Sequence, residues 1–286
     1  MSAILETEIK LVNEIGLPVR ADLRLPPGKD RAATILVLPG FKGFKDWGMF
    51  PPAARAWTEQ GFATVTINTS RNGIAESREE FTDLEGFAKN TPSREKKDAE
   101  LVLAAIRRGD LDARLDPDRI GILGHSRGGG IAVLVAAQDS RIRCIVTWGS
   151  ISTFLRYTDR AIQEWRKEGR LEVPNMRTGQ MMWLDREVLE DLEAHHDEYD
   201  LESACRKITA PALFIHGERD ESVDPEDSKR LYEWCASREK RLEIIPKTGH
   251  TFGAVHPWAG PTPGWETACR SSGEWFARNT GDRISE

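Results

Sequence analysis

One serine of this chain stands where it could act as a nucleophile. Residues 124–128 read Gly-His-Ser-Arg-Gly and fit the pattern G-x-S-x-G with Ser126 at its centre. The motif follows the apolar run of residues 119–123 and opens a second apolar stretch, which is the order strand, turn, helix. A turn tight enough to expose the Ser126 hydroxyl needs small residues on both sides, and Gly124 and Gly128 supply them. A helix cap formed by Ser126 is the alternative, but it does not explain the flanking glycines. The sequence therefore predicts Ser126 as a catalytic nucleophile.

The base that would activate Ser126 should be a histidine late in the chain. A serine hydroxyl attacks a carbonyl group when a neighbouring imidazole takes its proton, and with this motif the acid and then the histidine follow the serine. His250 directly follows the last predicted strand, whereas His256 lies farther along and precedes a proline. We therefore predict His250 as the base, with His256 as the alternative. The remaining histidines lie inside the motif (where we expect packing), in a long insertion or before the acid: His125, His195, His196 and His216.

The acid that orients the histidine should lie in the loop of residues 216–224. This loop carries three candidate carboxylates, Glu218, Asp220 and Asp224. Asp224 precedes Pro225, the pattern of a helix N-cap with proline at the first helical position. Glu218 is close to the end of the predicted strand. Asp220 has no competing structural role beyond that of a solvated loop carboxylate, so we predict that it is the acid.

Two backbone amides should bind the oxyanion that acyl transfer creates. One is the amide of Arg127, directly after the nucleophile and at the positive end of the following helix. The other should come from the loop of residues 38–44, Leu-Pro-Gly-Phe-Lys-Gly-Phe, where Gly40 and Gly43 let the backbone approach the site. The Phe41 amide is the predicted donor. A plain glycine-rich turn is the alternative.

The elements that must position these residues read as an α/β protein. Two early segments, 7–12 and 19–25, alternate polar and apolar residues around a turn and predict an antiparallel hairpin. Six apolar strands then alternate with helices, which predicts one domain over residues 1–286 with an eight-stranded, mostly parallel sheet covered by helices on both faces. The six strands are expected at 33–38, 62–68, 119–123, 142–148, 211–215 and 242–245, and the helices at 53–60, 93–108, 130–137, 225–236 and 265–277.

A long insertion interrupts this alternation at residues 150–207. It is rich in Trp, Met, Arg and Glu and is expected to be helical in pieces, as a lid or cap over the site. Soft and aromatic side chains in or next to it could line a pocket for an apolar or aromatic acyl or alcohol group. Packing within the insertion itself is the alternative for each of them. The predicted pocket residues are Trp148, Phe154, Tyr157, Met181, Met182 and Trp183.

Composition narrows the class of protein and its setting. The 286 residues carry 40 Lys and Arg against 46 Asp and Glu, a net charge of −6 that argues against a nucleic-acid surface. No apolar run reaches the roughly 18 residues of a membrane span, and the first residues do not read as a secretory signal. The four cysteines are far apart and show no CxxC spacing, so we expect reduced thiols and a cytoplasmic protein. A homo-oligomer is compatible with the sequence. The pair His195-His196 lacks further ligands, and we expect no metal or cofactor.

Four motifs together resemble the α/β-hydrolase superfamily, and within it the dienelactone-hydrolase-like and prolyl-oligopeptidase-like hydrolases. They are Leu-Pro-Gly-Phe-x-Gly at 38–43, Gly-His-Ser-Arg-Gly-Gly at 124–129, His-Gly-x-x-Asp at 216–220 and Gly-His-Thr-Phe at 249–252. The resemblance spans nearly the whole predicted sheet. It implies a metal-free hydrolysis with Ser126 as nucleophile, Asp220 as acid, His250 as base and Phe41 in the oxyanion loop.

The resemblance also has departures that bear on the substrate. Dienelactone hydrolases have cysteine where this chain has Ser126, and prolyl oligopeptidases carry a large propeller for which the chain has no room. The insertion resembles those of carboxylesterases and feruloyl or cinnamoyl esterases. We therefore expect a carboxylesterase acting on a small-molecule ester. A small peptidase or amidase, or a non-catalytic hydrolase-like binding protein, are the alternatives.

Overall fold

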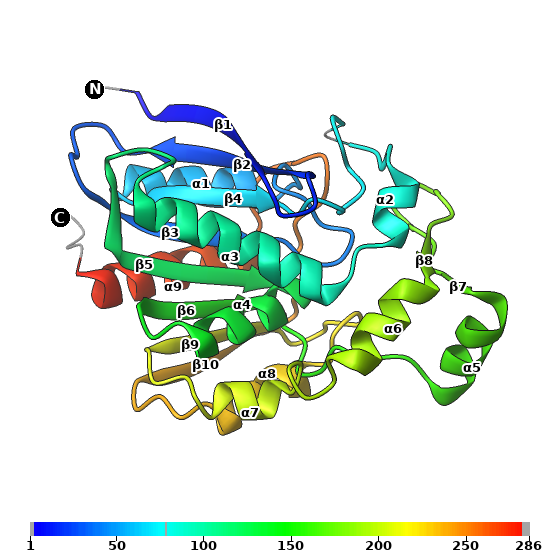
Figure 1. Ribbon diagram of the computed structural model, residues 1–286. Helices are drawn as coiled ribbons and strands as arrows, with labels where there is room; N and C mark the ends of the chain where they lie inside the picture. Colours follow the sequence, from blue (N-terminus) through cyan, green and yellow to red (C-terminus); the bar gives the residue numbers. More distant parts are fainter. Residues whose placement is uncertain (1–2, 78, 282–286) are drawn as a thin grey trace.

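Eight strands form one twisted sheet in the part of the chain that the computed structural model describes, residues 3–77 and 79–281 (Figure 1). Their spatial order is β1-β2-β4-β3-β5-β6-β9-β10. The first two strands form an antiparallel hairpin, β2 pairs antiparallel with β4, and the remaining neighbours are parallel. The predicted fold class is therefore confirmed. The strands are β1 (Leu5–Val12), β2 (Pro18–Leu25), β3 (Ala32–Leu38), β4 (Ala63–Asn68), β5 (Leu115–His125), β6 (Ile142–Trp148), β9 (Ala212–Gly217) and β10 (Lys240–Ile245).

Helices cover both faces of the sheet because its strands are apolar on both sides. All seven residues of β3 are buried, and alternate ones belong to two separate hydrophobic clusters. One cluster lies under α1 and α9, and the other lies under α3, α4 and α8; α3 and α4 cross the near face in Figure 1. These helices are α1 (Phe50–Glu59), α3 (Pro92–Arg108), α4 (Arg127–Gln138), α8 (Pro225–Trp234) and α9 (Pro263–Thr280).

The start of α8 confirms one reading made from the sequence. The side chain of Asp224 accepts a hydrogen bond from the backbone N–H of Glu226 at 2.9 Å, and Pro225 occupies the first helical position. Asp224 is thus the N-cap of this helix. This role leaves Asp220 as the aspartate of the loop that is free to face the catalytic edge.

The insertion is more varied than the sequence suggests. It contains the helices α5 (Asp159–Glu168), α6 (Arg186–Ala194) and α7 (Leu201–Cys205), and also a small antiparallel pair, β7 (Arg170–Glu172) with β8 (Trp183–Asp185). Strands of three residues are too short to show a polar-apolar alternation, which is why the sequence does not reveal them. The short helix α2 (Leu84–Ala88), between β4 and α3, also carries no sequence pattern of its own.

Candidate active site

Ser126 stands at a strained turn between β5 and α4. Its backbone angles are φ 55° and ψ −121°, which non-glycine residues rarely adopt. A Cβ atom on Gly124 would lie 2.1 Å from the carbonyl oxygen of Gly128, so the turn requires the glycine. The Ser126 side chain makes no capping hydrogen bond to α4, which excludes the helix-cap alternative. The hydroxyl is therefore presented by the turn without serving the helix.

Asp220 and His250 form a hydrogen-bonded pair at the same edge of the sheet. The Nδ1 atom of His250 lies 2.7 Å from Oδ2 of Asp220, whose side chain is fully buried. The other carboxylate oxygen accepts the backbone N–H groups of Ser222 and Val223, each at 2.9 Å. Burial raises the pKa of Asp220, but the hydrogen bonds from His216 and His250 outweigh it and hold that pKa below its ordinary value. An ionised carboxylate only accepts, so the proton of the imidazole is on Nδ1 and Nε2 is left as a base.

His216 is a neighbour of Asp220 in the candidate site that sequence reasoning missed. Its Nε2 atom lies 3.1 Å from Oδ2 of Asp220 and 2.9 Å from the carbonyl oxygen of Val223. Its Nδ1 atom lies 2.6 Å from the hydroxyl of Ser228. Two acceptors at Nε2 place its proton there, so His216 donates to the same carboxylate oxygen as His250. The signal was available: His216 ends β9 four residues before Asp220, within the motif His-Gly-x-x-Asp.

His125 holds the backbone of His250 against the turn that carries Ser126. Its Nε2 atom lies 3.1 Å from the carbonyl oxygen of His250, and the two rings are 4.6 Å apart. Burial lowers the pKa of His125 to about 3, and the nearby His250 lowers it as well. The imidazole is therefore neutral at pH 7 and donates to that carbonyl group. This is the packing role expected from the sequence.

Replacing His125 with glutamine should make folding less sensitive to acid. Between pH 6.5 and about 3 the unfolded wild-type chain binds a proton at His125 that the folded chain excludes, so its free energy of unfolding falls as the pH drops. Glutamine keeps an N–H donor for the His250 carbonyl but does not titrate. From pH 7 to pH 4.5, urea denaturation should show the wild type losing about 2 kcal/mol more than the variant. Equal losses would contradict a buried neutral imidazole.

Ser126 and the Asp220–His250 pair approach each other through the end of β6. The backbone N–H of Ser126 donates to the carbonyl oxygen of Trp148 at 2.9 Å. At the next residue, a Cβ atom on Gly149 would lie 3.3 Å from both Asp220 Oδ2 and His250 Nδ1. Within the described residues no hydrogen bond joins the Ser126 hydroxyl to His250. The two side chains nevertheless share one edge of the sheet.

The loop after β3 lies against the same turn. A Cβ atom on Gly40 would lie 2.7 Å from the carbonyl oxygen of His125, 2.8 Å from Cβ of Ser126 and 3.4 Å from the backbone nitrogen of Arg127. Any side chain at Gly40 would push the loop away. The loop that carries Phe41 therefore packs through Gly40 against the turn of Ser126, next to the first amide of α4.

The predicted pocket residues do not share one surface. Trp148 is fully buried, donates from Nε1 to the Ser272 hydroxyl at 2.9 Å and packs on Trp57, so it contributes to the core under α9 rather than to a cavity wall. Phe154 does line a cavity of about 310 Å³, together with Tyr199. The other four lie within the insertion and do not line that cavity. Tyr157 packs against Trp165, and the Trp183 ring lies under the guanidinium of Arg170. Met182 is fully buried, whereas Met181 is 52% exposed.

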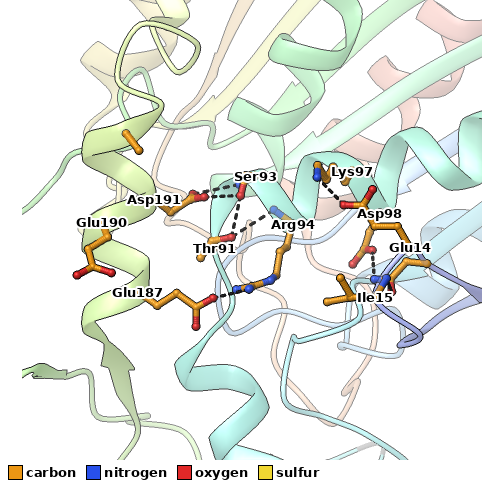
Figure 2. Close-up of a pocket in the computed structure, with 12 residues that line it drawn as sticks. Glu14, Ile15, Thr91, Ser93, Arg94, Lys97, Asp98, Glu187, Glu190 and Asp191 are labelled. Carbon is orange, nitrogen blue, oxygen red and sulfur yellow. Dashed lines mark hydrogen bonds and ion pairs between the residues drawn. The ribbon is translucent and has the colours of Figure 1, made fainter.

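A cavity of about 480 Å³ lies between α3, α6 and the turn after β1. Figure 2 shows its mostly charged lining, in which Ser93 and Arg94 of α3 face Asp191 and Glu187 of α6. Both the hydroxyl and the backbone N–H of Ser93 donate to Asp191, and Arg94 pairs with Glu187. These contacts fasten the insertion to the sheet domain. None of the three predicted catalytic residues lines this cavity.

The described ranges contain neither a metal-binding cluster nor a membrane-spanning helix. No group of three or more His, Cys, Asp or Glu side chains is arranged there to hold a metal ion. No helix in the same ranges is both long and apolar enough to cross a membrane.

The strand order, the serine at a strained strand-to-helix turn and the parallel strands beside it define an α/β hydrolase. Residues 50–258, almost three quarters of the chain, match the prolyl oligopeptidase family. The chain belongs to this family, and the protein is a hydrolase.

Curated relatives and solved structures agree with this assignment. A 31.7 kDa uncharacterized protein of the traX–finO intergenic region of Escherichia coli is 27% identical, covering 82% of this chain and 88% of that one. The uncharacterized peptidase YtmA of Bacillus subtilis is 28% identical, covering 80% and 79%. Among solved structures, DcsB with its substrate analogue superposes with a TM-score of 0.74 at 16% identity, covering 97% and 100%. Est1E of Butyrivibrio proteoclasticus with ferulic acid bound gives 0.69 at 18%, covering 96% and 100%. At such identities the two structures show the fold alone.

Proposed function

We propose that this protein is a serine hydrolase that cleaves the carboxylic ester of a small molecule through an acyl-enzyme on Ser126. The observation that supports the proposal most is the strained turn that presents Ser126 between two features. The loop of Phe41 packs against this turn through Gly40, and the pair of buried Asp220 and partly exposed His250 lies next to Gly149, at the end of the neighbouring strand. A hydroxyl placed between amide donors and an imidazole with a free Nε2 has the parts that acyl transfer needs.

The proposed reaction has two steps of the same kind. Nε2 of His250 takes the proton of Ser126 while Oγ attacks the carbonyl carbon, and the Phe41 and Arg127 amides hold the oxyanion. The imidazolium then gives its proton to the leaving alcohol, which leaves an acyl group on Ser126. A water molecule enters, loses a proton to His250 and attacks the acyl carbon; the bond to Ser126 then breaks, the imidazolium returns the proton to Oγ, and the carboxylic acid departs. Asp220 keeps the proton on Nδ1 and stabilises the imidazolium.

The choice of an ester is supported by two of the similar structures, the esterase domain of a Rhodothermus marinus protein and Est1E with ferulic acid bound. A small peptidase or amidase is the second candidate, favoured by the match to the prolyl oligopeptidase family and by the peptidase among the relatives. Both reactions use the same residues. Rates on p-nitrophenyl butyrate and on a set of aminoacyl p-nitroanilides distinguish them, since we expect turnover of the ester and much slower turnover of the anilides.

Labelling by a fluorophosphonate tests the proposed nucleophile. The reagent phosphonylates an activated serine and mimics the tetrahedral intermediate. We expect intact-protein mass spectrometry to show one adduct, tandem spectra to locate it on Ser126, and Ser126→Ala to remain unlabelled. A folded wild-type protein without an adduct would contradict the proposal and favour a binding protein instead.

The proposal also covers the role of the insertion and the location of the protein in the cell. We propose residues 150–207 as a cap, since they are fastened to α3 and carry Phe154 on a cavity wall. A cytoplasmic location fits the four cysteines, which are all free and buried.

A further inference from the structure

The side chain of Arg127 turns inward instead of into solvent. Its guanidinium lies over the ring of Phe41, 4.4 Å from the centroid, and donates from Nη2 to Oε1 of Glu95 at 2.6 Å. We propose that Arg127 is a positioning residue for the oxyanion hole. Anchored by Glu95, its guanidinium fixes the Phe41 ring and thereby the Phe41 amide opposite the Arg127 amide. This inference rests on the proposed function and deepens it.

The anchor is well built on α3. Glu95 is 6% exposed, and its Oε1 atom accepts a second hydrogen bond from Nδ2 of Asn90 at 2.7 Å. Asn90 stands directly before Thr91, the residue whose hydroxyl caps α3. These two hydrogen bonds hold the carboxylate of Glu95 in place, and with it the guanidinium of Arg127. The Arg127–Glu95 pair is largely buried, so it differs from the solvent-exposed ion pairs that are common on protein surfaces.

The ring of Phe41 is held from more than one side. Besides Arg127, the ring of Phe87 in α2 lies 5.2 Å away, and Nζ of Lys42 lies 5.3 Å from the Phe41 centroid. The guanidinium of Arg127 is itself largely buried. Its cation–π contact therefore attaches the Phe41 ring to the residue that directly follows Ser126.

This arrangement couples the two amide donors through one side chain. The Arg127 amide belongs to the turn of the nucleophile, and the Phe41 amide belongs to a loop almost 90 positions earlier in the chain. We call the contact of Arg127 with Phe41 and Glu95 the clamp. Without the clamp the loop can move relative to the turn, and the two amide donors no longer converge on one oxygen. Charge develops on that oxygen in the transition state, so the loss should lower kcat and leave the KM of an uncharged ester unchanged.

Four variants test the clamp by steady-state kinetics on p-nitrophenyl butyrate. Arg127→Met together with Glu95→Gln removes both charges, so no buried carboxylate is left unpaired. Its kcat should fall by about 10- to 100-fold, and its KM should change by about twofold or less. Phe41→Leu keeps the amide but removes the ring, and should give a similar fall. Arg127→Lys keeps a cation above the ring and should recover part of the rate. Combining Arg127→Lys with Phe41→Leu should cost less than the sum of the two.

A reversible inhibitor separates positioning from general damage to the structure. A trifluoromethyl ketone forms a tetrahedral adduct with the serine and places an oxyanion in the hole. Its inhibition constant should rise in the variants by the same factor by which kcat/KM falls. Lys96→Met is the matched control, because Lys96 is the residue after Glu95 on α3 and pairs with Glu100 of the same helix rather than with Phe41 or Arg127. Its kcat and inhibition constant should equal those of the wild type.

Several outcomes would overturn the clamp. A wild-type kcat in the charge-free double variant, or a lower kcat with unchanged inhibitor affinity, would leave Arg127 a structural role only. A raised KM with normal kcat would make Arg127 a substrate-binding residue. If the double variant does not fold, as judged by circular dichroism, the Arg127→Lys and Phe41→Leu pair decides the question. Fluorophosphonate labelling of the wild type separates these failures from failure of the proposed function.

Discussion

Replacing Ser126 with alanine is expected to lower kcat on p-nitrophenyl butyrate by about 10⁶-fold, close to the effect of removing the nucleophile from other serine hydrolases. Residues 124–128 carry no other hydroxyl group, so the variant cannot form the proposed acyl-enzyme at this turn. The rate that remains over water should reflect the oxyanion hole and binding alone. Steady-state kinetics on a preparation free of wild-type enzyme measures the effect.

The fold should be unchanged in this variant. Alanine has the same Cβ atom as serine, so the strain at φ 55° is retained, and no capping hydrogen bond is lost. The matched control is Ser150→Ala, which removes a buried hydroxyl that donates only to the carbonyl oxygen of Ile151. We expect both variants to show the wild-type circular dichroism spectrum and only Ser126→Ala to be inactive. A fully active Ser126→Ala protein would remove the nucleophile assignment.

Structural features that depend only on residues adjacent in the chain could be predicted from the sequence. Strands buried on both faces appear as continuous apolar runs, and the run at 33–38 is β3 within one residue. The cap at Asp224 could be read from Pro225 alone. The start of β5 could not be predicted, because the first residues of this strand include the charged Asp116 and Arg119. Their ion pair at 2.8 Å belongs to the folded state, and polar residues there hide the strand that pairs with β3.

Roles of side chains that depend on partners brought together by the fold could not be predicted from the sequence. The residue types of the candidate site could be found because each follows a strand, and parallel strands end at one edge. What His216 and Arg127 do depends on Asp220 and Glu95, which meet them only through the fold. Trp148 was predicted to line the pocket, but its side chain lies in the core. Alternate residues of β6 face opposite sides of the sheet, and its indole faces the side that α9 covers.

Replacing Asp220 with asparagine is expected to lower kcat by about 10⁴-fold, because the amide cannot keep the proton of His250 on Nδ1. Asp220 accepts hydrogen bonds from His250, His216, Ser222 and Val223, so every neighbour is a donor. The NH₂ group of asparagine would face at least one of them. That leaves a buried donor without an acceptor and should lower the free energy of unfolding at pH 7 by about 1–3 kcal/mol. Kinetics and urea denaturation measure the two effects.

Acid provides an independent check of the same carboxylate. The pKa of Asp220 is held below the ordinary aspartate value of about 3.9, so its contribution to stability is present above that pH and is lost as the pH falls toward the folded-state pKa. The stability difference between wild type and Asp220→Asn should therefore shrink below pH 4. Asp224→Asn is the matched control, since asparagine caps a helix as well as aspartate does. Loss of kcat in Asp224→Asn but not in Asp220→Asn would show that the acid had been assigned to the wrong residue of this loop.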